Sequence, residues 1–130
     1  MPLRCLLDTQ VIAWLAEGST KLSEKSKDVI LDPAAELYFS AASVWEMAIK
    51  ISIGKLKLPI SLRSMIERQV EINGLQEIPV TSEHSLAVEH LEILHREPFD
   101  RILICQAQIE GMTIITSDQS ILSYSVQSLW

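Results

Sequence analysis

Short apolar runs alternate along the chain with longer segments in which apolar residues recur every three or four positions. Short continuous runs are typical of buried β-strands, and the wider spacing is typical of helices with one buried face. The pattern predicts strands over residues 3–7, 37–40, 77–80, 112–116 and 126–130. Pro79 lies in the third run, which we expect at the edge of a sheet because proline lacks the N–H that a central strand donates.

The longer segments predict helices over residues 11–16, 23–31, 43–53, 62–73, 82–94 and 99–110. Residues that commonly cap helices stand near their ends. We expect N-caps at Ser23, Ser43, Ser61 and Ser82, and helix ends at Gly54, Gly74 and Gly111. The capping residues and the apolar spacing therefore agree on where most helices begin and end.

The order of these elements indicates the fold class. Strands that alternate with helices favour βαβ units and a parallel sheet. The runs 3–7 and 113–116 show no alternation of apolar and polar residues, which is typical of a sheet covered on both faces. We therefore predict an α/β fold, a three-layer α/β/α domain with a central parallel sheet of four to five strands. The length of 130 residues fits one domain spanning 1–130.

Composition excludes several classes of protein. A hydrophobic content of 48% excludes a disordered chain. No apolar run approaches the roughly 18 residues that a membrane span needs, and the first residues lack a signal-peptide cleavage site. We therefore expect a soluble, cytoplasmic protein. The net charge of −6 argues against binding nucleic acid by bulk electrostatics alone, but it is compatible with an acidic site that carries divalent cations.

Cysteine and histidine offer no obvious metal site. Cys5 and Cys105 each lie in an apolar segment without a CxxC pattern, which predicts buried thiols. His84, His90 and His95 lie along one helical stretch at spacings of six and five, which do not bring them onto a common face. We expect these histidines to be solvated or partly packed, with no part in catalysis.

Acidic residues stand where predicted strands give way to helices. Asp8 follows the first strand, Asp118 follows the fourth, Glu46 lies in the first turn after the second, and Asp100 begins the helix before the fourth. Each has a simple structural explanation. Asp8 and Asp118 could be N-caps, Ser43-x-x-Glu46 matches a capping box, and Asp100 could favour the positive end of a helix dipole.

Considered together, the four acids point to a metal site. The carboxyl ends of parallel strands share one edge of the sheet, where ligands bind, so the four side chains are expected to converge there. Asp100 reaches that edge only if its helix starts beside it. Clustered carboxylates repel one another, and a hard cation such as Mg²⁺ is their natural counter-charge. A site of this kind can support metal-assisted phosphodiester hydrolysis.

The same residues resemble a known family. The segments Leu6-Leu7-Asp8-Thr9, Ser43-x-x-Glu46, Pro98-Phe99-Asp100-Arg101-Ile102-Leu103 and Thr116-Ser117-Asp118 are similar to motifs of the PIN-domain ribonucleases. They resemble in particular the VapC-type toxins of toxin–antitoxin pairs, above all in the segment SAASVWEMAIKISIGKLKLP at residues 40–59. The resemblance extends over essentially the whole chain.

The resemblance implies an activity, a cofactor and partners. It implies an endoribonuclease dependent on Mg²⁺ or Mn²⁺, a homodimer, and a cognate antitoxin that covers the acidic pocket. The catalytic and metal-binding residues implied are Asp8, Glu46, Asp100 and Asp118, with Asp8 and Asp100 as the principal ligands. Thr9 and Thr116 would orient carboxylates or waters. Gln10 departs from close relatives, which often carry His there.

Basic residues leave alternatives open. Lys50, Lys55 and Lys57, with Arg63 nearby, could bind RNA phosphates or could simply be solvated. Arg101 could contact a substrate phosphate, although we favour pairing with Asp100.

Two further points concern function. Trp14 and Trp45 lie in apolar helical patterns, so we expect packing rather than base stacking. The alternative function is a catalytically silent PIN-like module that binds RNA or protein, which the complete set of four acids disfavours.

Overall fold

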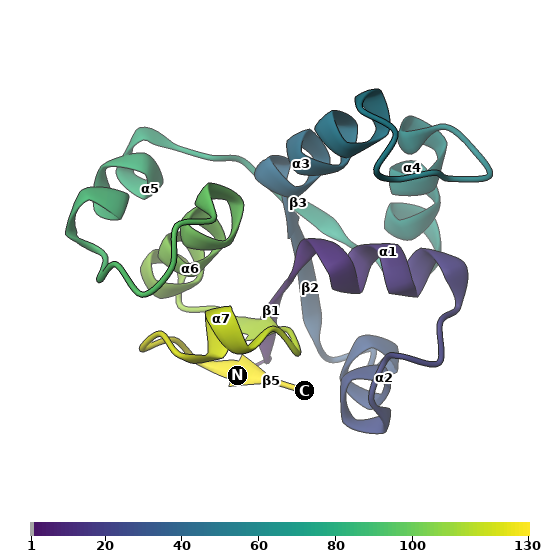
Figure 1. Ribbon diagram of the computed structural model, residues 1–130. Helices are drawn as coiled ribbons and strands as arrows, with labels where there is room; N and C mark the ends of the chain where they lie inside the picture. The colour runs from purple at the N-terminus through teal and green to yellow at the C-terminus, as the bar shows by residue number, and fades with distance from the viewer. Residues whose placement is uncertain (1) are drawn as a thin grey trace.

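Parallel strands form the centre of the molecule in the computed structural model, which describes residues 2–130 (Figure 1). Within that range the sheet has five strands in the order β3-β2-β1-β4-β5, and every neighbouring pair is parallel. They are β1 (Arg4–Leu7), β2 (Glu36–Ser40), β3 (Gln76–Ile78), β4 (Thr113–Ile115) and β5 (Ser128–Leu129). The predicted parallel sheet is confirmed, as is the edge position of the strand next to Pro79.

Helices follow the strands and cover both faces of the sheet (Figure 1). They are α1 (Thr9–Glu17), α2 (Glu24–Leu31), α3 (Ala41–Ser52), α4 (Leu62–Asn73), α5 (Ser82–Ala87), α6 (Pro98–Glu110) and α7 (Gln119–Leu122), with a 3-10 turn, η1 (Val88–His90). Within residues 2–130, no helix has both the length and the apolar character needed to cross a membrane.

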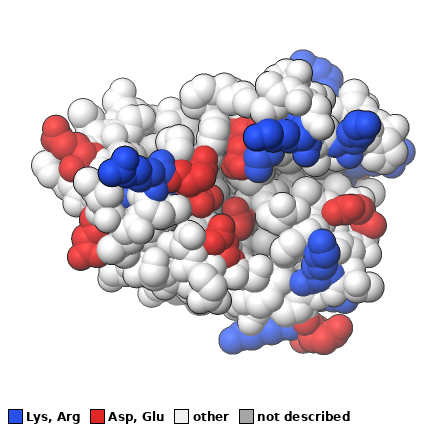
Figure 2. All heavy atoms as spheres, viewed as in Figure 1, with Lys and Arg blue, Asp and Glu red and all other residues white. Residues whose placement is uncertain are grey.

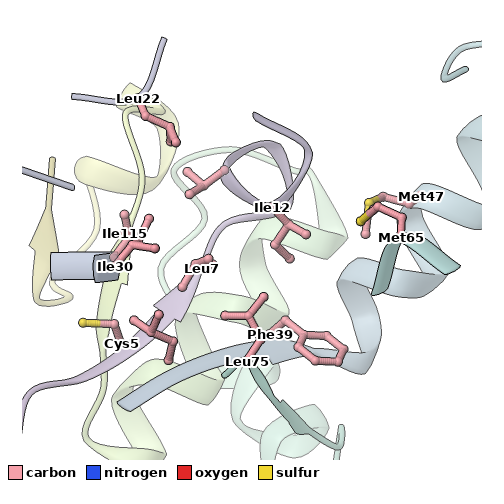
Figure 3. Close-up of a cluster of buried hydrophobic side chains, with 12 residues drawn as sticks. Cys5, Leu7, Ile12, Leu22, Ile30, Phe39, Met47, Met65, Leu75 and Ile115 are labelled. Carbon is pink, nitrogen blue, oxygen red and sulfur yellow. The ribbon is translucent and has the colours of Figure 1, made fainter. Parts of the chain in front are cut away.

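Alternate residues of the central strands pack into two different cores, which explains the uninterrupted apolar runs. Cys5 and Leu7 of β1 face α1–α4 and belong to a cluster with Ile12, Met47 and Met65, among others (Figure 3). Leu6 faces the opposite side and packs with residues of β3, β4, α6 and α7, including Ile78, Leu103, Ile114 and Ile121. Both faces are therefore apolar, as a three-layer α/β/α fold requires. Cys5 and Cys105 are buried, as predicted.

Some helix boundaries differ from the prediction. The N-caps at Ser23 and Ser61 are confirmed, and left-handed Gly74 and Gly111 end α4 and α6. Ser40, rather than Ser43, caps α3, because β2 runs directly into the helix and Ser43 is already inside it. The predicted capping box with Glu46 is therefore wrong.

The predicted helix 82–94 is also wrong in its length. It is capped by Thr81 rather than Ser82, α5 ends at Ala87, and only the η1 turn follows. The backbone of residues 91–97 takes another path because carbonyl oxygens in it accept hydrogen bonds from the Arg101 guanidinium instead of from a following helical turn. The three histidines therefore do not share one helix. α7 was not predicted, since four residues are too few to show a periodic pattern.

The two tryptophans of the apolar patterns differ in their surroundings. Trp14 packs against the apolar cluster that contains Cys5 and Leu7, and the centroid of its ring lies 5.8 Å from that of Trp130. Trp45 stays 64% exposed and meets the edge of Phe99, with ring centroids 5.1 Å apart. Packing rather than base stacking is thus confirmed for Trp14, while Trp45 presents much of its ring at the surface.

Candidate metal-dependent active site

The four acids predicted to converge line one cavity of about 290 Å³ at the carboxyl edge of the sheet. Asp8 directly follows β1, Glu46 lies on the helix that follows β2, and Asp118 follows β4. Asp100 joins them because α6 begins beside the cavity, which the sequence left undecided. Figure 2 shows acidic side chains gathered around a hollow near the centre of this face, with basic side chains to either side.

Asp8 occupies the N-cap position of α1 without capping the helix. Its backbone N–H extends the sheet by donating to the Ile115 carbonyl at 3.1 Å, but its side chain makes no capping hydrogen bond. The carboxylate instead accepts a hydrogen bond from the Thr116 hydroxyl at 2.8 Å. The side chain is only 6% exposed and lines the cavity. A metal-ligand role therefore does not compete with a capping role.

Thr116 joins the ends of β1 and β4. Its hydroxyl donates to Asp8 and accepts from the backbone N–H of Asp118 at 3.0 Å. Asp118 caps α7, as predicted, by accepting from the Ser120 N–H at 2.8 Å. Thr116 thus orients a carboxylate, which is the role expected for it. Thr9 makes a different contact, because its hydroxyl donates to Ser43 at 2.8 Å and ties α1 to α3.

Glu46 has one paired and one unpaired oxygen. Its Oε2 forms an ion pair with Lys50 at 2.8 Å, one helical turn along α3. Its Oε1 is buried and has no hydrogen-bond partner among the described residues. A buried polar atom without a partner is costly and calls for an explanation, such as a missing ion or water. The Glu46 carboxylate and the Asp8 carboxylate line the same cavity.

Burial and mutual repulsion perturb the carboxylates. Burial, together with the charges of Asp100, Asp118 and Glu46, raises the pKa of Asp8 to about 6, although the hydrogen bond from Thr116 lowers it. Burial also raises the pKa of Asp100, where the hydrogen bond to His95 acts in the opposite direction. The cavity therefore holds more negative charge than its own side chains neutralise.

Two residues that the sequence did not single out hold Asp100 in place. Glu97 caps α6 by accepting from the Asp100 N–H at 2.8 Å, and it lines the cavity as a fifth acid. His95 lies 3.0 Å from Asp100 Oδ2 through its Nε2. The available signal was Pro98, which favours the first turn of a helix and places Glu97 at the capping position. No comparable pattern pointed to His95.

Arg101 does not have either of its predicted roles. It is 9% exposed, and its guanidinium donates to the carbonyls of Leu91 and Glu92 and to the Tyr124 hydroxyl. The favoured pairing with Asp100 does not occur among the ion pairs of the described residues, and burial removes the guanidinium from substrate. Arg101 is instead a structural residue that holds the segment before α6.

The oxygen donors fit a hard divalent cation. In the described part of the chain, no three His, Cys, Asp or Glu side chains form a ready-made metal cage. Mg²⁺ rarely uses such a cage, since it usually keeps several waters and takes one or two carboxylates together with substrate phosphates. The buried Asp8, the mostly buried Asp100 and the unpartnered Glu46 oxygen offer that kind of donor set.

Known proteins share this fold. A chain of VapBC2 from Rickettsia felis bound to a promoter DNA fragment matches with a TM-score of 0.71 at 12% identity, covering 98% of each chain. DNA-bound VapBC from Salmonella typhimurium gives 0.67 at 12% identity, covering 98% of this chain and 97% of that chain. VapBC-5 from Mycobacterium tuberculosis gives 0.62 at 15% identity, covering 98% of each.

Sequence comparison identifies the family independently of these structures. No curated protein matches the chain significantly. The family model of the PIN domain, however, matches residues 5–126, which include all four acids. The chain therefore belongs to the PIN domain family.

Proposed function

We propose that this protein is a metal-dependent endoribonuclease and the toxin of a toxin–antitoxin pair. The observation that carries the proposal is the cavity in which Asp8, Glu46, Asp100 and Asp118 come together at the carboxyl edge of the sheet. Membership of the PIN family and structural likeness to VapBC complexes support a nuclease of the toxin type.

In this proposal the carboxylates bind Mg²⁺ or Mn²⁺, with Asp8 and Asp100 as the principal ligands and Glu46 and Asp118 completing the site. The bound cation would acidify a water and offset the charge that develops on the phosphate. Thr116 fixes the orientation of Asp8 through its hydrogen bond. Lys50 neutralises one oxygen of Glu46 and stands at the rim of the cavity, where a substrate phosphate would approach.

A second groove extends the site along the surface. Gln10, Ala13 and Leu56 line both the acidic cavity and this groove, which also contains Lys57 and Arg68. Cations next to a metal site can position the phosphates that flank the bond to be cleaved. We propose that single-stranded RNA passes from the acidic cavity into this groove, because unstacked bases can lie against its apolar wall.

The partners follow from the likeness to VapBC. The similar structures are complexes of toxin–antitoxin systems, some with DNA. We propose that the chain forms a homodimer and binds a cognate antitoxin, encoded by a short neighbouring reading frame, that covers the acidic cavity. Co-expression tests this part, since a bound antitoxin should co-purify with the protein and block cleavage.

The catalytic proposal is tested by RNA cleavage with purified protein. Cleavage should require Mg²⁺ or Mn²⁺, stop with EDTA, and fall at least 100-fold in Asp8→Asn, since a principal ligand is lost. Asp28→Asn, an exposed acid on α2, is the matched control and should cleave normally. Cleavage by Asp8→Asn at the wild-type rate would refute the metal site. Metal binding and RNA binding without any cleavage would favour the catalytically silent module.

A further inference from the structure

A chain of hydrogen bonds runs from the acidic cavity into the protein. Asp100 Oδ2 lies 3.0 Å from His95 Nε2, and His95 Nδ1 lies 2.9 Å from the Tyr124 hydroxyl. The Arg101 guanidinium donates to the same hydroxyl at 2.8 Å. Arg101 and Tyr124 are buried, and Asp100 and His95 are mostly buried. The segment 95–101 and the distant Tyr124 thus meet behind one candidate metal ligand.

The partners of Tyr124 determine which ring nitrogen of His95 carries the proton. The hydroxyl oxygen accepts from Arg101 and from the backbone N–H groups of Leu94 and His95. The lone pairs of the hydroxyl oxygen are therefore already occupied by donors. The nearest acceptor for the hydroxyl proton itself is His95 Nδ1. Nδ1 must then be unprotonated. The proton lies on Nε2, which donates to the Asp100 carboxylate.

The reverse tautomer would be unfavourable at both ends. A proton on Nδ1 would give the Tyr124 oxygen a fourth donor, with only the His95 carbonyl, at 3.4 Å, left to accept the tyrosine proton. It would also leave the bare Nε2 lone pair facing a carboxylate oxygen 3.0 Å away. Arg101 and Tyr124 therefore select the Nε2–H form.

We propose that His95, held in the Nε2–H form by Tyr124 and Arg101, is the positioning residue that fixes the Asp100 carboxylate for metal binding. The inference rests on the proposed metal site. Holding Oδ2 leaves Oδ1 of Asp100 for a cation, while Glu97 fixes the backbone of the same residue. Partners behind a metal ligand of this kind orient the ligand and commonly contribute 10–100-fold, by order of magnitude, to metal affinity.

The alternative is that His95 only stabilises the segment before α6. Its ring meets Tyr124 edge-on with centroids 5.3 Å apart, so removing it would also loosen packing. The two roles differ in what a conservative replacement restores. Glutamine can place an amide N–H near the position of Nε2, whereas leucine fills similar volume with no donor.

The test measures Mn²⁺ binding by isothermal titration calorimetry in His95→Leu, His95→Gln and wild type, without RNA. We expect about a tenfold weaker dissociation constant in His95→Leu and a value within about threefold of wild type in His95→Gln. Tyr124→Phe should weaken Mn²⁺ binding as well. Without the hydroxyl, either ring nitrogen of His95 can carry the proton, while the aromatic ring at position 124 is retained. Thermal melting verifies that each variant is folded.

A second measurement does not depend on metal. Nitrogen-15 NMR of His95 in the metal-free protein should give the Nε2–H pattern in wild type and a mixture of tautomers in Tyr124→Phe. The Nδ1–H pattern in wild type, or equal Mn²⁺ affinity in wild type and His95→Leu, would overturn the proposal. Wild type that binds no Mn²⁺ at all would refute the metal site of the proposed function, and this inference with it.

Discussion

At the scale of single residues, the surroundings of Asp8 favour the protonated carboxyl more than water does. The carboxylate is nearly fully buried and faces three other acids, which together outweigh the hydrogen bond from Thr116 and raise its pKa to about 6. A folded-state pKa above the unfolded value means that the folded protein binds this proton more tightly. The contribution of Asp8 to stability is therefore fully present below pH 4 and is lost as pH rises through about 6.

Asp8→Asn should therefore stabilise the metal-free protein at neutral pH. One pKa unit corresponds to about 1.4 kcal/mol, so the rise from 3.8 to about 6 sets an upper bound of about 3 kcal/mol at pH 7.5. Asparagine can still accept the Thr116 hydrogen bond and carries no charge. Urea unfolding at pH 7.5 and pH 4.5 in EDTA measures the effect, which should fall to about 1 kcal/mol at the lower pH.

In the same experiment with Mg²⁺, wild type should be more stable than Asp8→Asn. A cation that binds only the folded state stabilises wild type by an amount that grows with the logarithm of the ratio of its concentration to its dissociation constant, and Asp8→Asn should gain little. Asp28→Asn, at an exposed position, should match wild type in all conditions. Equal stability of Asp8→Asn and wild type at pH 7.5 in EDTA would contradict the repulsion assigned to the cavity.

At the scale of helices and strands, sequence patterns predicted the elements whose apolar residues recur at regular spacing. Short apolar runs predicted β1, β2 and β4. Because these strands are parallel, the residues that follow them, Asp8, Glu46 and Asp118, lie at one edge of the sheet, as predicted. The segment 91–97 could not be predicted, because it has no periodicity and its path depends on side-chain contacts with Arg101 and with Tyr124, which is distant in sequence. The role of His95 went unnoticed for this reason.

Helix caps show the same limit on a smaller scale. The side chain of Thr81 accepts from the His84 N–H at 3.2 Å, and His84 Nδ1 accepts in return from the Thr81 N–H at 3.0 Å. The third helical position of a capping box is normally Glu or Gln, so a histidine there gave no signal.

Thr81→Ala should destabilise the protein, and Ser82→Ala should not. The loss of a side-chain cap costs about 1 kcal/mol, while Ser82 is exposed and its hydroxyl makes no hydrogen bond within residues 2–130. Urea unfolding compares the two variants, and hydrogen exchange of the α5 amides locates the effect. Destabilisation by Ser82→Ala without destabilisation by Thr81→Ala would assign the cap to Ser82 instead.

At the scale of the whole molecule, charge is divided between the acidic hollow and its rim. The chain carries a net charge of −6, yet Lys55, Lys57 and Arg68 lie beside the hollow and form no ion pair within the described residues. Figure 2 shows basic side chains close to the central acids on this face. In the proposed function, this division would allow RNA to bind despite the overall charge, because phosphates respond to the local cations and to bound metal.

RNA binding should therefore depend on salt through this rim. In an Asp8→Asn background, which prevents cleavage, Lys55→Ala, Lys57→Ala and Arg68→Ala should each weaken binding of a single-stranded RNA. Each lost phosphate contact should also reduce the slope of log affinity against log salt concentration by about 0.7. Lys25→Ala, on exposed α2, is the control and should leave both affinity and slope unchanged. The same loss in Lys25→Ala as in the rim variants would mean that RNA senses only total charge, and the groove would not be its path.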